Sequence, residues 1–161
     1  MNRSQLIRIH ASAGMTAFAL ITVFFTASLV AELSRITQWT VLVKTLIFYS
    51  MWVMLILMPL AVSTGLKLAG KSQHPIVARK KARLRWLMPN GLILLGLAYW
   101  LYQRAITHQF DQLFIGLQVL ELVLGAINII LLGQMIRDGF QLRSKAKKSS
   151  TTRPLNQNQF S

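Results

Sequence analysis

The sequence predicts an all-α integral membrane protein, an up-down bundle of four transmembrane helices with both termini in the cytoplasm. First, the chain has 161 residues, 53% of them hydrophobic, and a mean hydropathy of +0.47, which is too apolar for a soluble domain of this size. Second, it contains four apolar stretches, and a bilayer core requires about 20 apolar residues per helix. Third, a strongly basic segment separates the second stretch from the third.

The first span is expected near residues 9–31, behind Arg3 and Arg8. A cleaved signal peptide also begins with cations, but its apolar core is about 7–15 residues long and ends in small residues. Here the apolar run is longer, and Leu29 does not fit a cleavage motif that ends at Ala31. A retained first helix is therefore favoured over a cleaved one.

The second span is expected near residues 41–66. Trp39 precedes it in a polar connector and has the amphipathic ring that favours the membrane interface. Pro59 predicts a kink within the helix. Lys44 lies early in this span, so we expect it to extend toward the head groups or to pair with Glu32 across the connector.

A basic cytoplasmic loop is expected over residues 67–86. It carries seven cations and no acid, namely Lys67, Lys71, Arg79, Lys80, Lys81, Arg83 and Arg85. Pro75 suits the first turn of an amphipathic helix that would lie at the membrane interface. The cations lie between apolar spans, so the expected partners are anionic lipid head groups and not nucleic acid, despite a net charge of +14.

Pro89 and Asn90 mark a turn into the third span, near residues 87–103, whose aromatic belt would be Tyr99, Trp100 and Tyr102. The fourth span is expected near residues 113–136. Residues 1–143 thus form a single membrane domain, and residues 144–161 are basic, polar and poor in aromatic residues, which is typical of a disordered cytoplasmic tail.

The distribution of cations predicts the orientation in the membrane. Of the 18 lysines and arginines, only Arg35, Lys44 and Arg104 lie on the side opposite the basic loop. Short loops rich in lysine and arginine stay in the cytoplasm, which places both termini there.

Residues 65–72, GLKLAGKS, match the pattern of a phosphate-binding P-loop. That loop needs a buried strand before it and a helix after it. Here an apolar helix precedes the match, and the chain has no room for a parallel sheet. We therefore expect no nucleotide partner.

A polar stripe is predicted on the fourth span. Asp111, Gln118, Glu121, Gly125 and Asn128 fall within one arc at 100° per residue. Such a stripe faces the bundle interior, and an ionisable group inside a membrane is a functional hypothesis by default. Two interpretations stay open: hydrogen bonds that hold the helices together, or proton, ion or quinone chemistry.

A second candidate site lies at the cytoplasmic ends of the helices. His10 and His74 belong to one side of the membrane, and two imidazoles on a helical bundle are a common way to hold haem b iron. Further residues that would bind such a cofactor are Arg79, Arg83 and Asn90. Alternatively, both histidines only form hydrogen bonds at the interface. His108 is expected in an outer connector, and without cysteine the chain has no c-type haem attachment.

Several stretches resemble an uncharacterised family of small four-helix bacterial inner-membrane proteins: RIHASAG, PLAVSTG, RKKARLRWLMPNG, QVLELVLGAIN and RDG. The resemblance covers residues 6–143 and implies a multi-pass protein of the bacterial inner (plasma) membrane, without implying an activity. SQLIRIHASAG also resembles the segment that opens the first helix of the cytochrome b subunit of succinate dehydrogenase. That likeness implies a quinone and haem-propionate role for Ser4, Arg8 and His10, although Ala11 stands where that family has an arginine.

Three functions follow as expectations. The first is a small cytochrome-b-like or quinone-interacting electron-transfer protein, with haem b or quinone bound near the cytoplasmic leaflet. The second is an ion- or proton-coupled transporter or channel component that uses Glu121. The third is a noncatalytic membrane partner or assembly factor. Whether the chain is an enzyme, forms a homo-oligomer or binds another membrane protein stays open.

Overall fold

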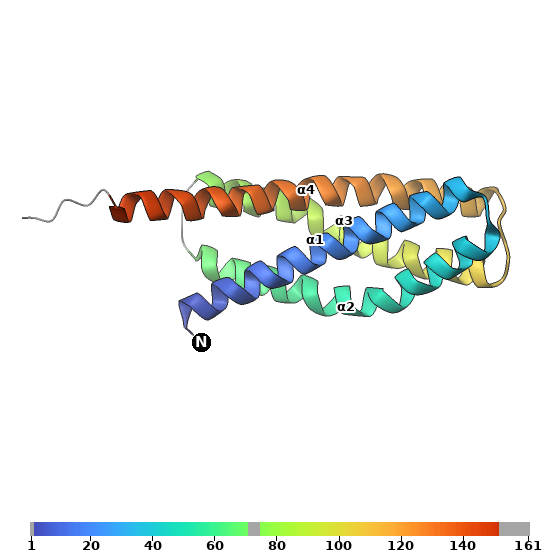
Figure 1. The fold of residues 1–161 in the computed structure, drawn as a ribbon, viewed down its shortest axis with the longest axis horizontal. Coiled ribbons are helices and arrows are strands. Elements are labelled where there is room, and N and C mark those ends of the chain that lie inside the picture. Colours follow the sequence, from blue (N-terminus) through green and yellow to red (C-terminus); the bar gives the residue numbers. More distant parts are fainter. Residues whose placement is uncertain (1, 71–74, 152–161) are drawn as a thin grey trace, which may run out of the picture.

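The computed structural model describes residues 2–70 and 75–151, which form four long helices. These are α1 (Arg3–Ser34), α2 (Thr37–Ala69), α3 (Pro75–Ile106) and α4 (Gln112–Thr151). They run antiparallel in chain order, and α4 ends at the end of the bundle where α1 begins (Figure 1). We call this the termini end, and the opposite end, which carries the α1–α2 and α3–α4 connections, the connector end.

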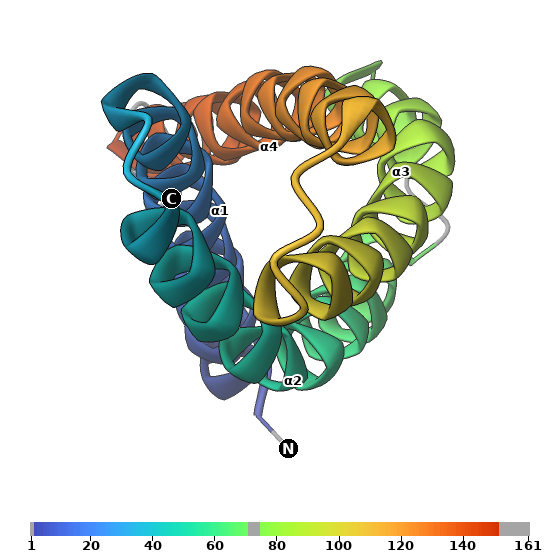
Figure 2. The ribbon, with the colours of Figure 1, turned by 90° about the vertical axis from the view of Figure 1, so that its right-hand side faces the viewer.

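The four helices form a ring in chain order (Figure 2). Each helix packs against its two neighbours, α4 returns to α1, and the diagonal pairs make no close backbone contact in the described residues. The predicted all-α, up-down bundle is confirmed. Because opposite helices stay apart, side chains alone must fill the space in the middle.

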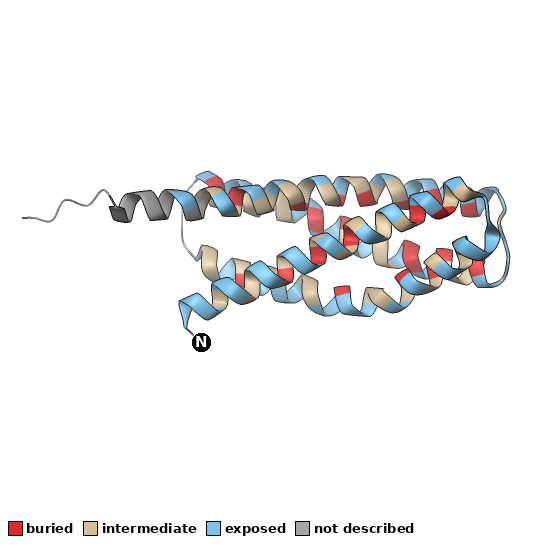
Figure 3. Cartoon of the chain, in the orientation of Figure 1, coloured by how far each residue is buried: buried red, intermediate tan, exposed pale blue. Residues whose placement is uncertain are grey.

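Three helices are long and apolar enough to cross a membrane: α1, α2 and residues 112–141 of α4. Large apolar side chains are exposed on them, for example Val23, Ile56 and Ile130, and exposed positions recur along the described part of each helix (Figure 3). Such outward-facing apolar surface is unfavourable in water and favourable in lipid. The chain is therefore a multi-pass membrane protein.

Helix α3 differs from the expected loop followed by a short span. It runs without interruption from Pro75 to Ile106, so most of the basic segment is helical and no turn occurs at Pro89 and Asn90. A proline inside a helix removes one hydrogen bond, here to the carbonyl of Arg85, and can be tolerated with a kink. Its cations and Pro89 make α3 the least apolar of the four, which is why it is not among the three helices that are both long and apolar enough to span.

Helix α4 is also longer than expected. The sequence predicted a disordered tail from residue 144, but the backbone is helical to Thr151. Residues 152–161 lie outside the described part of the chain. The last turns continue the preceding helix because nothing in residues 137–151 breaks it: there is no proline, and Gly139 costs only about 1 kcal/mol relative to alanine.

The two connections at the connector end are short. Arg35 takes a left-handed conformation, with φ 55°, directly after α1, and His108 does the same after α3. Asp111 begins α4 by accepting the backbone N–H of Phe114 at 3.0 Å. These tight connections hold neighbouring helices in register over their whole length.

The packed core is divided into two clusters. One contains Ala17, Met54, Leu87 and Leu132, and the other contains Leu101, Ala105 and Phe114 near the connector end. A set of buried polar residues lies beside these clusters and includes Lys44, Gln118 and Asn128.

Candidate functional site

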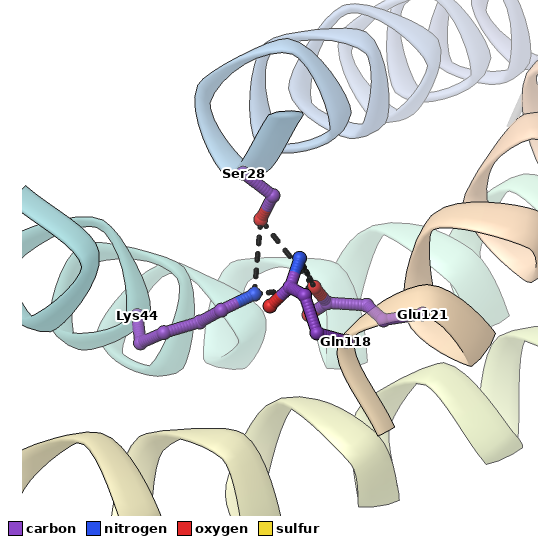
Figure 4. A network of polar contacts seen from close by, with 4 residues as sticks. All are labelled: Ser28, Lys44, Gln118 and Glu121. Atoms are coloured by element: carbon purple, nitrogen blue, oxygen red, sulfur yellow. Dashed lines mark hydrogen bonds and ion pairs between the residues drawn. The ribbon is translucent and has the colours of Figure 1, made fainter. Parts of the chain in front are cut away.

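A buried ion pair between Lys44 and Glu121 is the centre of a polar network in the bundle interior (Figure 4). Lys44 is only 2% exposed and also donates to the Ser28 hydroxyl at 3.1 Å. The Ser28 hydroxyl and the Gln118 amide each lie 3.4 Å from Glu121 Oε2. Charges buried in an apolar bundle need such partners, since an isolated charge there is strongly disfavoured.

The register of the helices explains how these side chains meet. Ser28 lies close to the end of α1 and Lys44 close to the start of α2, so the short α1–α2 connection places them at one level. Glu121 faces them from α4, one turn after Gln118. The expected pair of Lys44 with Glu32 does not form, because Lys44 points into the bundle toward Glu121.

The network leaves two acceptor atoms without a partner. Ser28, Lys44 and Gln118 all contact Oε2 of Glu121, and no described residue donates to Oε1. The amide oxygen of Gln118 is buried and also has no donor within residues 2–70 and 75–151. A hydrogen-bond donor brought into this region would thus find an acceptor ready for it.

A second polar pair lies deeper toward the termini end. Asn90 Nδ2 donates to the backbone carbonyl of Leu124 at 3.0 Å and to Oδ1 of Asn128 at 2.7 Å. The Leu124 carbonyl can only accept, so it fixes the orientation of the Asn90 amide, and this in turn fixes that of Asn128. Asn128 Nδ2 is then a donor with no acceptor among the described residues.

A cavity of about 400 Å³ borders both polar groups, with Glu121 and Asn128 in its wall. Its walls come from all four helices and are almost entirely apolar, and the polar residues that line it are Ser28, Glu121 and Asn128. Lys44 and Gln118 lie behind the wall, so the cavity faces the carboxylate and not the ammonium group.

The cavity opens sideways between α2 and α3. Several of its lining residues are also exposed on the outer surface, namely Leu55, Pro59, Met88, Pro89 and Leu92. Gly91 faces Met58 here, and a Cβ at position 91 would lie 3.9 Å from the Met58 methyl group. Two prolines and a glycine thus occur where α2 and α3 border the opening.

The candidate cofactor residues at the termini end are only partly brought together. His10 Nδ1 lies 2.9 Å from the carbonyl of Ala61 and 3.3 Å from the Thr64 hydroxyl, and its ring packs over Gly65, where a Cβ would be 2.8 Å from the imidazole. His10 does not line the cavity. His74 lies outside the described residues.

The cations expected around those histidines have other surroundings. Arg83 forms an ion pair with Asp138, and Arg79 is exposed. Burial lowers the pKa of the Lys80 ammonium group, an effect that the nearby Asp138 carboxylate partly opposes. Asn90, expected near this group, instead bonds to Asn128 on the stripe of α4.

Sequence reasoning identified one side of the network and missed the other. The stripe residues Gln118, Glu121 and Asn128 are all buried, whereas Asp111 is exposed at the connector. Ser28 was missed, as a lone serine in an apolar helix carries little signal. Lys44 gave the usable signal, since a lysine within an apolar span needs a partner.

The described residues contain no group of three or more histidine, aspartate or glutamate side chains that could hold a metal ion. Comparisons with protein-family models, with curated proteins and with solved structures found no match to this chain. The resemblances drawn from short sequence stretches therefore identify no family, and the function is inferred below from the geometry of the bundle.

Proposed function

We propose that this protein binds a quinone-type molecule, an apolar compound with a polar ring, inside its transmembrane bundle. The observation that carries the proposal is the cavity of about 400 Å³, with apolar walls and, among the described residues, only Ser28, Glu121 and Asn128 as polar lining residues. Ligand pockets are commonly about 300–1,000 Å³, mainly apolar, with a few convergent polar groups.

The opening between α2 and α3 supports a ligand that arrives from the bilayer. Leu55, Met88 and Leu92 line the cavity and are also exposed on the outer, apolar surface of the helices. A molecule dissolved in lipid could enter there without crossing water. The proposed site lies in the middle of the bundle, and thus deeper than the cytoplasmic leaflet where His10 had suggested it.

The proposal includes a four-span arrangement with both termini in the cytoplasm of a bacterial cell, in its inner membrane. Helix α3 has 32 residues, and at 1.5 Å per residue it extends about 48 Å, enough to cross a bilayer. It packs between α2 and α4, which are both apolar enough to span. The basic start of α3 would then lie among cytoplasmic head groups.

Filling the cavity from one glycine tests the proposal. The variant Gly91→Leu adds a side chain on the cavity wall, where a Cβ meets only the Met58 methyl group at 3.9 Å. We expect it to weaken binding of a short-tailed benzoquinone in lipid nanodiscs by more than tenfold. The matched control is Gly96→Leu on the same helix, because Gly96 is exposed and a Cβ there meets nothing within 4 Å.

Binding is measured by separating nanodiscs from free quinone and quantifying the bound compound. Nanodiscs without protein are subtracted, since quinones dissolve in lipid. The proposal predicts saturable binding to the wild-type protein and to Gly96→Leu. Equal binding by Gly91→Leu, or no binding above that of plain nanodiscs, contradicts it.

The haem form of the hypothesis requires two axial ligands or one ligand and an open position. In the described structure, His10 leaves its Nε2 without a hydrogen-bond partner, while Nδ1 is placed by the Ala61 carbonyl. The test is an absorption spectrum of the protein purified after expression with ample haem. A Soret band that His10→Ala removes supports this form, and a colourless wild-type protein rejects it.

A second candidate function, proton-coupled transport, is favoured by the ion pair between Lys44 and Glu121 in the bundle interior. Intramembrane carboxylates paired with cations commonly mark ion or proton paths. This function predicts that Glu121→Gln abolishes proton flux in proteoliposomes. Unchanged flux in that variant rejects it.

A further inference from the structure

We infer that the cavity recognises the reduced, dihydroxy form of its ligand, a quinol, by placing it between Glu121 and Asn128. The inference depends on the proposed quinone-type function and adds which form of the ligand the site prefers. It derives from two polar atoms that have no partner among the described residues and whose side chains line the cavity, Glu121 Oε1 and Asn128 Nδ2.

The two side chains present opposite hydrogen-bonding character. The carboxylate of Glu121 can only accept, and its Oε1 has no donor among the described residues. Asn128 Oδ1 accepts a hydrogen bond from Asn90, so the Nδ2 group of Asn128 remains as a donor. A ligand that satisfies both residues must therefore donate at one end and accept at the other.

The spacing along α4 suits a single ring. Glu121 and Asn128 are seven residues apart on one helix, which places them on the same face with an axial separation of about 10.5 Å. Their side chains leave the helix in the same direction, so their polar ends keep a similar spacing. An aromatic ring with oxygens on opposite sides, extended by two hydrogen bonds of about 2.8 Å each, has a comparable length.

The charge of the site selects a neutral ligand. Lys44 already balances Glu121, so a cation would meet no net negative charge and an anion would meet the carboxylate at the cavity wall. A quinone carries only acceptor oxygens and can use Asn128 alone. A quinol carries two hydroxyl groups, so one can donate to Glu121 while the other accepts from Asn128.

The experiment compares three short-tailed compounds in nanodiscs containing the full chain: the benzoquinol, its benzoquinone and the dimethyl ether of the quinol. The last two lack a donor. We expect the quinol to bind at least tenfold more tightly than either, as is typical for one hydrogen bond to a charged acceptor. Equal affinities for the three compounds overturn the inference and leave the proposed function in place.

A paired variant tests the role of Glu121. Lys44→Met with Glu121→Leu removes the acceptor without leaving a single buried charge, which such double replacements tolerate well. This variant should bind the quinol and the quinone with about equal affinity. It should remain in Arg104→Gln with Asp111→Asn, which removes an ion pair at the connector end, away from the cavity.

The outcomes separate the two proposals. A preference that persists in the Lys44 and Glu121 double variant overturns the inference. If the double variant does not fold, the ranking of the three compounds on the wild-type protein still decides. Failure of all three compounds to bind rejects the proposed function, and the inference with it.

Discussion

At the scale of single residues, Lys44 and Glu121 are two charges inside an otherwise apolar bundle, and each is tolerated because the other is present. Both are buried, and Ser28 and Gln118 add hydrogen-bonding partners. Burying an ion pair does not itself ensure stability, because desolvation can exceed the attraction between the charges. However, removing one partner leaves the other charge buried without a counter-ion. This is far more damaging than removing both partners.

This predicts how variants of the pair behave. Lys44→Met leaves Glu121 buried without its cation and should destabilise the bundle by about 3–5 kcal/mol, whereas Lys44→Met with Glu121→Leu should be close to the wild type. Unfolding in a denaturing detergent, followed by circular dichroism, measures the difference. A double variant no more stable than the single one would show that the charges do not act as a pair.

The same residues show what could be predicted at this scale. The burial of Gln118, Glu121 and Asn128 follows from their spacing within one helix. The partner of Lys44 cannot be predicted in this way, because the sequence pattern allows either Glu32 or Glu121 to pair with it. Only the rotation of α2 about its axis, which depends on packing with α1 and α3, decides between them.

At the scale of elements, the start of α4 depends on Asp111. Its carboxylate accepts the N–H of Phe114 and pairs with Arg104, which joins the end of α3 to the start of α4. The Phe114 hydrogen bond, with a smaller contribution from Arg104, holds the pKa of Asp111 below its usual value of 3.8. In general, a carboxylate at a helix N-terminus is stabilising because it accepts free backbone N–H groups and interacts favourably with the helix dipole.

The pH dependence follows from the direction of this shift. The folded pKa lies below the unfolded one, so the ionised carboxylate stabilises the fold above pH 3.8, and this contribution is lost as the pH falls through the folded pKa. Asp111→Ala should therefore lower the melting temperature at pH 7 and have less effect in acid. Gln109→Ala, in the same connector, is the control; a loss that stays constant down to pH 3 would contradict the assignment.

The boundaries of the elements were predicted unevenly. The predicted spans 9–31 and 41–66 lie within α1 and α2, but both helices extend beyond them at each end, into the polar flanking residues. Pro89 suggested a turn, but it lies within α3, since a proline costs one hydrogen bond while the packing of Leu87, Leu97 and Leu101 on the same helix stabilises both sides of it. The helix-breaking tendency of Pro89 is thus outweighed by packing contacts with other helices, which no single stretch of sequence reveals.

At the scale of the whole molecule, four antiparallel helices surround a space that is open to the side. The up-down order follows from short connections and could be predicted. The cavity could not be predicted, because it is the space that the side chains lining it leave unfilled, among them Ile21, Met54, Ala98 and Leu122. Its volume depends on the distance between diagonal helices, which the sequence pattern does not determine.

The membrane arrangement of the whole molecule gives a further prediction. The chain has no cysteine, so single cysteines can be introduced without background. If α3 spans the bilayer, Thr107→Cys should react with a membrane-impermeant thiol reagent in spheroplasts, and Lys81→Cys should react only after the membrane is opened. Labelling of both positions in intact spheroplasts, or of neither, would mean that α3 does not cross.

The most direct test of the account is to map where a photoreactive quinone attaches to the protein in nanodiscs. Binding in the cavity predicts attachment by mass spectrometry at Met51 and Met54, which line it, and competition by excess unmodified quinone. Attachment only at Trp52 and Ile56, which are exposed on the lipid-facing side of the same helix, would contradict a ligand site inside the bundle.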